Sequence, residues 1–78
     1  MTVEERMRQV IREVLDDDDL ELTDDTTAAD IEAWDSLAHI NIMFTLESEF
    51  NVQFTDTQLY QFRNVGELRR FLDGSISQ

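Results

Sequence analysis

The sequence predicts an all-α protein, a small bundle of three main helices and one short helix. Apolar residues recur at helical spacing in separate segments, capping boxes precede two of these segments, and residues that stop helices follow them. The 78 residues suffice for one domain with a small core. We therefore expect a single domain over residues 1–78, of which residues 75–78 form a frayed tail.

The first helix is predicted from a capping box at residues 2–5 and one apolar face. This face, which we expect to be core, consists of Val3, Met7, Val10, Ile11, Val14 and Leu15. The acidic run at residues 16–19 should end the helix, because neighbouring carboxylates repel one another and aspartate is a poor helix-interior residue.

A long acidic loop is predicted between the first and second helices. Residues 16–35 contain ten acidic side chains and no basic ones. We expect Leu20, Leu22 and Ile31 to pin this loop to the core. Trp34 should close the loop over the bundle, with its indole N–H toward solvent or backbone.

A calcium-binding loop is the alternative reading of this acidic segment, and it fails on register. Counted from Asp16, Glu21 stands where such a loop needs glycine and Thr27 where it needs the closing glutamate. Counted from Asp24, Ala29 stands at the glycine position. We therefore predict no metal site.

The second helix should run from Ser36 to about Phe50, with Asp35 as its N-cap. Its large apolar side chains span roughly 220° at ~100° per residue, which is typical of a central helix packed by several neighbours. They are Leu37, Ile40, Ile42, Met43, Phe44, Leu46 and Phe50. We expect Leu37 or Phe44 to be left for a partner.

A connection anchored by Val52 and Phe54 should follow the second helix. A capping box at residues 55–58 then predicts the short helix, with Leu59 and Phe62 pointing inward. The neighbouring Tyr60 is given no role.

The last helix is predicted from a cap at Asn64 and an apolar face. The face contains Val65, Leu68, Phe71 and Leu72. We expect Gly74 to end this helix.

Composition limits the functions that the chain can have. Eighteen acidic residues against six arginines give a formal net charge of −12, which argues against nucleic acid as a ligand and favours partners with basic docking surfaces. No apolar run is long enough for membrane insertion, and the N-terminus lacks the apolar core of a signal peptide. Without cysteine there is no disulfide and no thiolate zinc site. We expect a cytoplasmic monomer.

Ser36 is the candidate functional residue. With Asp35 as the N-cap, Ser36 falls in the first helical turn, where side chains are exposed and backbone N–H groups lack partners. A phosphate ester on its hydroxyl would meet these donors and the positive end of the helix dipole. A hydrolase triad with His39 and Asp35 is the alternative, but Asp35 is better used as the cap. We expect His39 to flank the attached group or pack against the loop.

At these residues the chain resembles the acyl carrier proteins. Asp35-Ser36-Leu37 stands at the start of the second helix, and the helix ends in the family's order of acidic and apolar positions, Glu47 to Val52. The resemblance implies an acyl-carrier-type bundle without catalytic residues. It also implies that a phosphopantetheinyl transferase moves 4′-phosphopantetheine from coenzyme A onto Ser36, beside Asp35 and Leu37. The thiol of this arm would hold an acyl group as a thioester.

The resemblance further implies surfaces for partners and cargo. Acyl-loading and acyl-processing enzymes with basic patches would dock on Asp35, Leu37, Phe44, Glu47 and Glu49. An interior between the second and third helices would shelter part of an acyl chain, lined by Ile40, Met43, Leu59 and Phe62.

Two positions depart from the typical fatty-acid carrier, since Ala38 and Asn41 stand where that carrier has acidic residues. The form Trp34-Asp35-Ser36-Leu37 is also common among free-standing carriers of specialised pathways. These departures favour a specialised fatty-acid or polyketide-type pathway over housekeeping synthesis. An aminoacyl, peptidyl or D-alanyl cargo stays open. An acidic helical protein-binding module without a prosthetic group is the alternative of another class.

Overall fold

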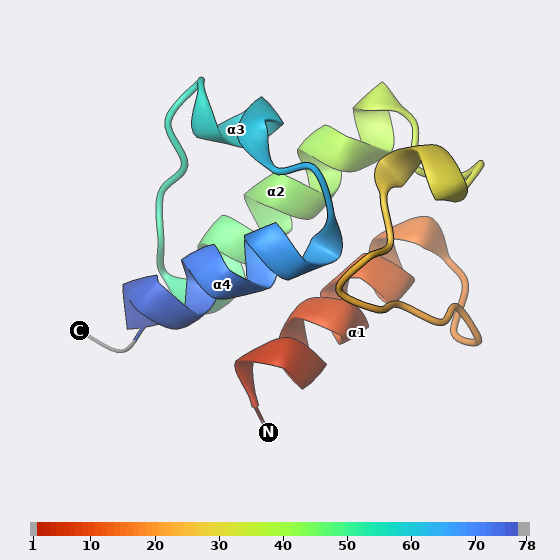
Figure 1. The fold of residues 1–78 in the computed structure, drawn as a ribbon, viewed down its shortest axis with the longest axis horizontal. Coiled ribbons are helices and arrows are strands. Elements are labelled where there is room, and N and C mark those ends of the chain that lie inside the picture. The colour runs from red at the N-terminus through yellow and green to blue at the C-terminus, as the bar shows by residue number, and fades with distance from the viewer. Residues whose placement is uncertain (1, 77–78) are drawn as a thin grey trace.

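The computed structural model describes residues 2–76, and its elements are all helical. In chain order they are α1 (Val3–Leu15), the 3₁₀ helix η1 (Ala28–Asp30), α2 (Ser36–Phe50), α3 (Gln58–Gln61) and α4 (Val65–Ile76). In Figure 1, α1, α2 and α4 form the body, α3 lies above them, and residues 16–35 cross one side. The predicted bundle of three main helices and one short helix is confirmed.

Helix α1 begins and ends where the sequence predicts. The Thr2 hydroxyl accepts a hydrogen bond from the Glu5 N–H at 3.1 Å, which satisfies one open donor of the first turn. Asp16 follows the helix in the left-handed conformation (φ 56°), and its N–H reaches the carbonyls of Arg12 and Glu13. Aspartate tolerates this conformation better than most residues, so it closes the helix.

The core lies where α1 packs against both α2 and α4. Its buried members come from these helices and from the connections between them: Met7, Val10, Ile11, Leu15, Leu22, Trp34, Ile42, Met43, Leu46, Phe54, Val65, Leu68 and Leu72. Phe54, Phe62 and Phe71 form a ring cluster at its edge, with centroids 5.3–6.0 Å apart. Leu20 and Ile31 are partly buried against the core, as expected of loop anchors.

The acidic loop contains one helical turn that the sequence analysis missed. Residues Ala28–Asp30 form η1, in which an oxygen of the Asp30 side chain accepts a hydrogen bond from the Thr27 N–H at 3.0 Å. Thr27 and Asp30 have capping-box spacing, but aspartate replaces the usual glutamate or glutamine. The turn brings the chain toward Trp34 and the start of α2.

The same loop is tied to the first turn of α4. The N–H groups of Val65 and Gly66 donate to the carbonyls of Thr26 and Asp24, each at 2.9 Å. Arg69 donates through Nε and Nη2 to the two carboxylate oxygens of Asp24, at 3.1 and 3.0 Å. The hydrogen bond from Arg69 lowers the pKa of the Asp24 carboxyl below its ordinary value of 3.8.

The hydrogen bonds of both predicted caps in the second half of the chain are present. Thr55 and Gln58 exchange backbone-to-side-chain hydrogen bonds at 3.0 and 3.2 Å in the turn that leads into α3, whose N-cap Thr57 makes no side-chain cap bond. The Asn64 side chain accepts from the Glu67 N–H at 2.9 Å and so caps α4.

The predicted end of the last helix is wrong. Helix α4 passes through Gly74 and continues to Ile76, so residues 75 and 76 are helical. Gly74 does not have a positive φ angle. Glycine permits a left-handed helix end but does not impose one, and here it stays in the helical conformation. Residues 77 and 78 of the predicted tail lie outside the described residues.

Candidate functional site

Ser36 is the first residue of α2 and is exposed. Asp35 precedes it in an extended conformation, and Oδ1 of Asp35 accepts from the Ala38 N–H at 2.8 Å. The Asp35 carbonyl accepts from the His39 N–H at 2.9 Å, which closes the first turn. The Ser36 hydroxyl therefore lies at the positive end of the helix dipole, where first-turn N–H groups lack intrahelical acceptors.

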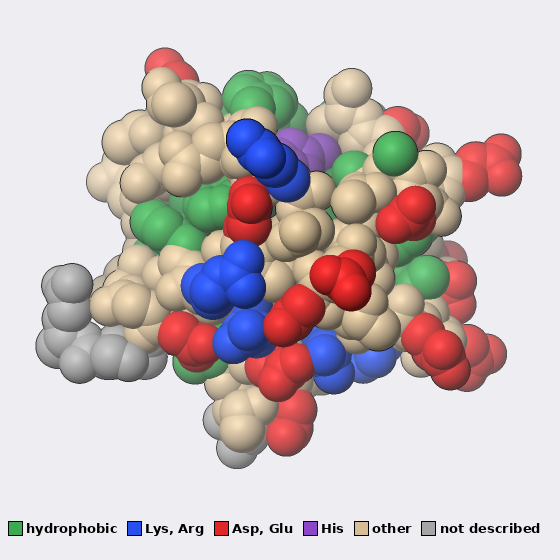
Figure 2. Space-filling view, viewed as in Figure 1, with side chains coloured by type: hydrophobic (Ala, Val, Ile, Leu, Met, Phe, Trp, Pro, Cys, Tyr) green, Lys and Arg blue, Asp and Glu red, His purple; other side chains and the backbone are tan. Residues whose placement is uncertain are grey.

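A hollow of about 200 Å³ adjoins Ser36. Figure 2 shows the histidine surface in a notch between two raised parts of the molecule. The hollow is lined by Ala28, Trp34, Asp35, Ser36, His39 and Tyr60. Three of the six lining residues carry aromatic rings, and Ser36 is one of the other three. This arrangement fits a group that is attached through a phosphate ester and has apolar parts that can contact the rings.

Two hydrogen bonds fix the aromatic wall of the hollow. The buried Trp34 indole N–H donates to His39 Nδ1 at 3.1 Å, and His39 Nε2–H donates to the Leu59 carbonyl at 2.6 Å. A carbonyl only accepts, so the neutral histidine carries its proton on Nε2. The expectation that the indole N–H faces solvent or backbone is wrong, because it meets a side chain of α2. The expectation that Trp34 closes the loop over the bundle is confirmed by its burial.

The three rings also stack in sequence. The centroids of Trp34 and His39 are 6.2 Å apart and those of His39 and Tyr60 are 5.8 Å apart, with interplanar angles of 27° and 30°. Both nitrogens of His39 are engaged away from the Ser36 hydroxyl. The arrangement therefore orients an aromatic surface and does not build a serine nucleophile with its base.

Tyr60 is the site residue that the sequence analysis missed. Its ring is 69% exposed and shares the hollow with Ser36. Ring stacking on His39 brings it there from a different helix. No periodicity relates a residue of α3 to the start of α2, so the sequence held no signal for this proximity.

The expected acyl-chain lining is only partly brought together. A second, narrower and partly open cavity of about 50 Å³ is lined by Met43 and Phe62, together with Trp34 and His39 among others. Ile40 and Leu59 are partly buried but do not line it. At this volume the cavity has room for no more than a few water molecules.

The predicted docking residues lie on α2, apart from Asp35, which precedes it, and they are exposed except for the half-buried Glu47. Leu37 is 72% exposed and Phe44 54%, and Phe44 borders a shallow surface depression with Glu47. Glu47 also accepts from the Phe54 N–H at 2.8 Å, and Glu49 pairs with Arg6 at 3.3 Å. Both glutamates thus have intramolecular partners, and their docking role stays a prediction.

Two further features bear on function within residues 2–76. No helix among them is long and apolar enough to span a membrane. Their histidine, aspartate and glutamate side chains form no group of three or more that is placed to hold a metal ion.

Comparisons with known proteins match nearly the whole chain. The family model described as a phosphopantetheine attachment site matches residues 5–72. The structure is similar to the solution NMR structure of a holo acyl carrier protein from Geobacter metallireducens, with a TM-score of 0.88. The two sequences are 36% identical, and the match covers 99% of this chain and 88% of that one.

Proposed function

The chain belongs to the phosphopantetheine-attachment family of carrier proteins, and from this premise we propose that Ser36 is the residue that bears the arm. The arm is the prosthetic group of the protein, covalently attached 4′-phosphopantetheine. The protein is a carrier and not an enzyme. The family interacts with phosphopantetheinyl transferases and acyl-processing enzymes. We further propose that residues 1–78 form one carrier domain.

The observation that supports Ser36 is its exposed hydroxyl at the start of α2, beside the hollow. The first turn of α2 would stabilise the phosphate charge through its N–H groups and the helix dipole. Asp35 holds this turn in place through its bond to the Ala38 N–H. When bound, the arm supplies a terminal thiol on which an acyl group is held as a thioester.

Reaction with coenzyme A and a phosphopantetheinyl transferase tests this assignment. Intact mass should show one added arm on the wild type and none on Ser36→Ala. Ser48→Ala is the matched control, because Ser48 is an exposed serine of the same helix. An arm on Ser36→Ala, or none on the wild type, would contradict the proposal. The second outcome would favour the acidic binding module without a prosthetic group.

We propose that the carrier serves a specialised fatty-acid or polyketide-type pathway. Asn41 is exposed on α2, where typical fatty-acid carriers have an acidic residue. An exposed ion pair contributes ~0.2–1 kcal/mol, so its absence should weaken docking on a housekeeping enzyme by up to several-fold. Asn41→Glu should raise the rate with such an enzyme, and the gain should shrink as salt increases.

The outcome that would reject a specialised pathway is a wild type that already equals a standard fatty-acid carrier in this assay. Ala38 is left unchanged in the test because it packs partly against the core. An aminoacyl, peptidyl or D-alanyl cargo would use the same arm, and trapping the loaded thioester from cells distinguishes these cargos by mass.

We also propose a cytoplasmic monomer. A reducing compartment would keep the terminal thiol of the arm free for acylation. Leu37, Phe44 and Tyr60 are single exposed apolar side chains, which are ordinary on the surface of a monomer.

A further inference from the structure

We propose that Tyr60, held in place by His39 and Trp34, is the binding surface for the pantoyl part of the arm. The arm would then lie against α3 and not extend freely from the start of α2. This inference rests on the proposed attachment at Ser36, and the experiment below separates the two.

The first support is the position of Tyr60 relative to the attachment atom. Ser36 and Tyr60 line the same hollow, although they belong to α2 and α3. In phosphopantetheine the pantoyl unit directly follows the phosphate, so it is the first part of the arm that can reach the wall of the hollow. Its geminal methyl groups are apolar and branched, which suits contact with a ring face.

The second support is the rigidity of the surface. Buried Trp34 donates to His39, and His39 donates to the carbonyl of Leu59, the residue directly before Tyr60. The rings of His39 and Tyr60 stack at 5.8 Å. The Tyr60 ring is therefore oriented before the arm arrives, so binding loses little conformational freedom.

The third support is the difference in size between the two cavities. The Tyr60 ring is exposed in the larger one, whereas the narrower cavity that Trp34 and His39 also line measures about 50 Å³. A branched pantoyl unit is larger than the few water molecules that this volume admits. The outer hollow, of about 200 Å³, is thus the available apolar surface beside Ser36.

Arm-to-protein contacts can be measured by NMR on a loaded protein. The chain is labelled with ¹³C and ¹⁵N and loaded with an unlabelled arm from coenzyme A, and intact mass establishes the loading. Isotope-filtered spectra should then show nuclear Overhauser contacts between the pantoyl methyl protons and the Tyr60 ring protons. The methyl signals should shift upfield from those of free pantetheine, since they lie over a ring face.

Three variants identify the source of these signals. Tyr60→Phe should keep the contacts and the upfield shift, and Tyr60→Ala should lose both. Gln61→Ala is the matched control, an exposed neighbour on α3 that does not line the hollow, and it should keep both. Amide spectra that match the wild type outside α3 show that each variant is folded.

A loaded wild type without the Tyr60 contacts, with methyl signals like those of free pantetheine, would overturn the inference and leave the attachment at Ser36 intact. Contacts that persist in Tyr60→Ala would overturn it as well. Failure to load shown by mass would instead reject the proposed function.

Discussion

The two glycines of α4 occupy opposite environments. A Cβ at Gly66 would lie 2.9 Å from the Cβ of Asp24 and 3.0 Å from its carbonyl oxygen, while a Cβ at Gly74 would meet nothing within 4 Å. Gly66 also donates its N–H to that carbonyl. The absence of a side chain at Gly66 therefore lets the acidic loop approach the first turn of α4, and this backbone contact depends on glycine.

Alanine at each position should have opposite effects on stability. Gly66→Ala should lower the free energy of unfolding by about 1–3 kcal/mol, as overpacking does, because backbone atoms must move. Gly74→Ala should raise it by about 0.5–1 kcal/mol, because alanine loses less conformational freedom in a helix. Urea denaturation followed by circular dichroism measures both. If Gly66→Ala instead raised the free energy of unfolding as much as Gly74→Ala, the acidic loop would be able to move aside at no energetic cost.

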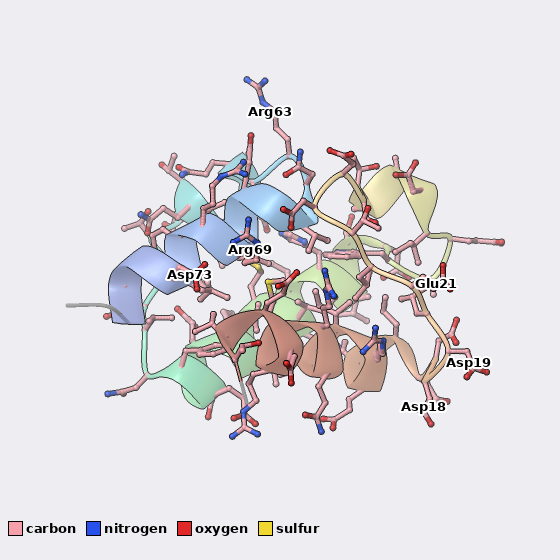
Figure 3. All side chains as sticks on the ribbon, turned by 60° about the horizontal axis from the view of Figure 1, so that its bottom comes forward. Asp18, Asp19, Glu21, Arg63, Arg69 and Asp73 are labelled. Atoms are coloured by element: carbon pink, nitrogen blue, oxygen red, sulfur yellow. The ribbon has the colours of Figure 1, made fainter. Side chains whose placement is uncertain are left out.

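The Asp24–Arg69 pair makes part of the stability depend on pH. Because the folded-state pKa of Asp24 is lowered, its contribution is complete above its ordinary pKa of 3.8 and is lost as the pH falls through the lower folded value. The wild type should melt higher than Asp24→Asn at neutral pH, and this difference should vanish in strong acid. Asp18→Asn, which removes a carboxylate that projects outward in Figure 3, controls for net charge. A difference that stays constant across this range would refute the role of the pair.

At the scale of elements, the hydrogen bonds of His39 join three segments. The ring links Trp34 at the end of the loop, its own helix α2, and the Leu59 carbonyl of α3. Helix α3 has four residues, too few to be stable alone. Its position therefore depends on this link and on the inward packing of Leu59 and Phe62.

Removal of the histidine ring should loosen α3 selectively. In His39→Ala the amide hydrogens of Gln58–Gln61 should exchange faster with solvent, because local opening no longer breaks the bond to Leu59. Exchange in the buried part of α1 should change little, since the hydrogen bonds and ring stacking of His39 involve residues outside that helix. Hydrogen exchange read by NMR gives both rates, and uniform acceleration would mean that His39 supports the whole bundle.

Several elements follow from local sequence alone. The N-caps Thr2 and Asp35 set the starts of α1 and α2, and side-chain hydrogen bonds within three residues are visible as sequence patterns. The end at Gly74 was predicted wrongly because a glycine does not determine its own φ angle. The turn η1 was missed because aspartate took the place of a longer acidic side chain in its cap.

The functional site likewise has one part that the sequence predicts and one part that it does not. Ser36 could be proposed from its position after a cap, which is a local property. The wall of the hollow could not, because Trp34, His39 and Tyr60 meet only after the loop, α2 and α3 have packed together. Long-range contacts of this kind produce no regular residue spacing from which they could be predicted in a single sequence.

The charges of the whole molecule are unevenly distributed. Five of the six arginines lie on α1 and α4, and α2 has none. Figure 2 shows arginine surface mixed with acidic surface in the lower part of this face. In Figure 3, Asp18, Asp19 and Glu21 project from the outer edge of the loop, while Arg69 and Asp73 point toward each other. Arginines thus pair with acidic side chains on the body of the bundle, whereas the carboxylates at the outer edge of the loop repel one another.

Added salt should therefore stabilise the protein. The net charge of −12 opposes the compact state, and screening weakens this repulsion, so the melting temperature should rise with sodium chloride. The rise should be smaller in a variant with Asp18→Asn and Asp19→Asn, which lacks two of the outward carboxylates. Differential scanning calorimetry measures the melting temperature of both proteins at each salt concentration. A melting temperature that does not change with salt would show that solvent already screens the loop charges.

The buried indole beside the hollow has a practical consequence. Trp34 is the single tryptophan of the chain, and its N–H is bonded to a ring that also borders Ser36. Its ultraviolet-excited emission arises from one known position next to the proposed attachment point. The protein thus contains an intrinsic fluorophore, and we expect loading or acylation of the arm to change its emission wavelength or intensity, which a fluorimeter follows in real time without a dye or a fused reporter.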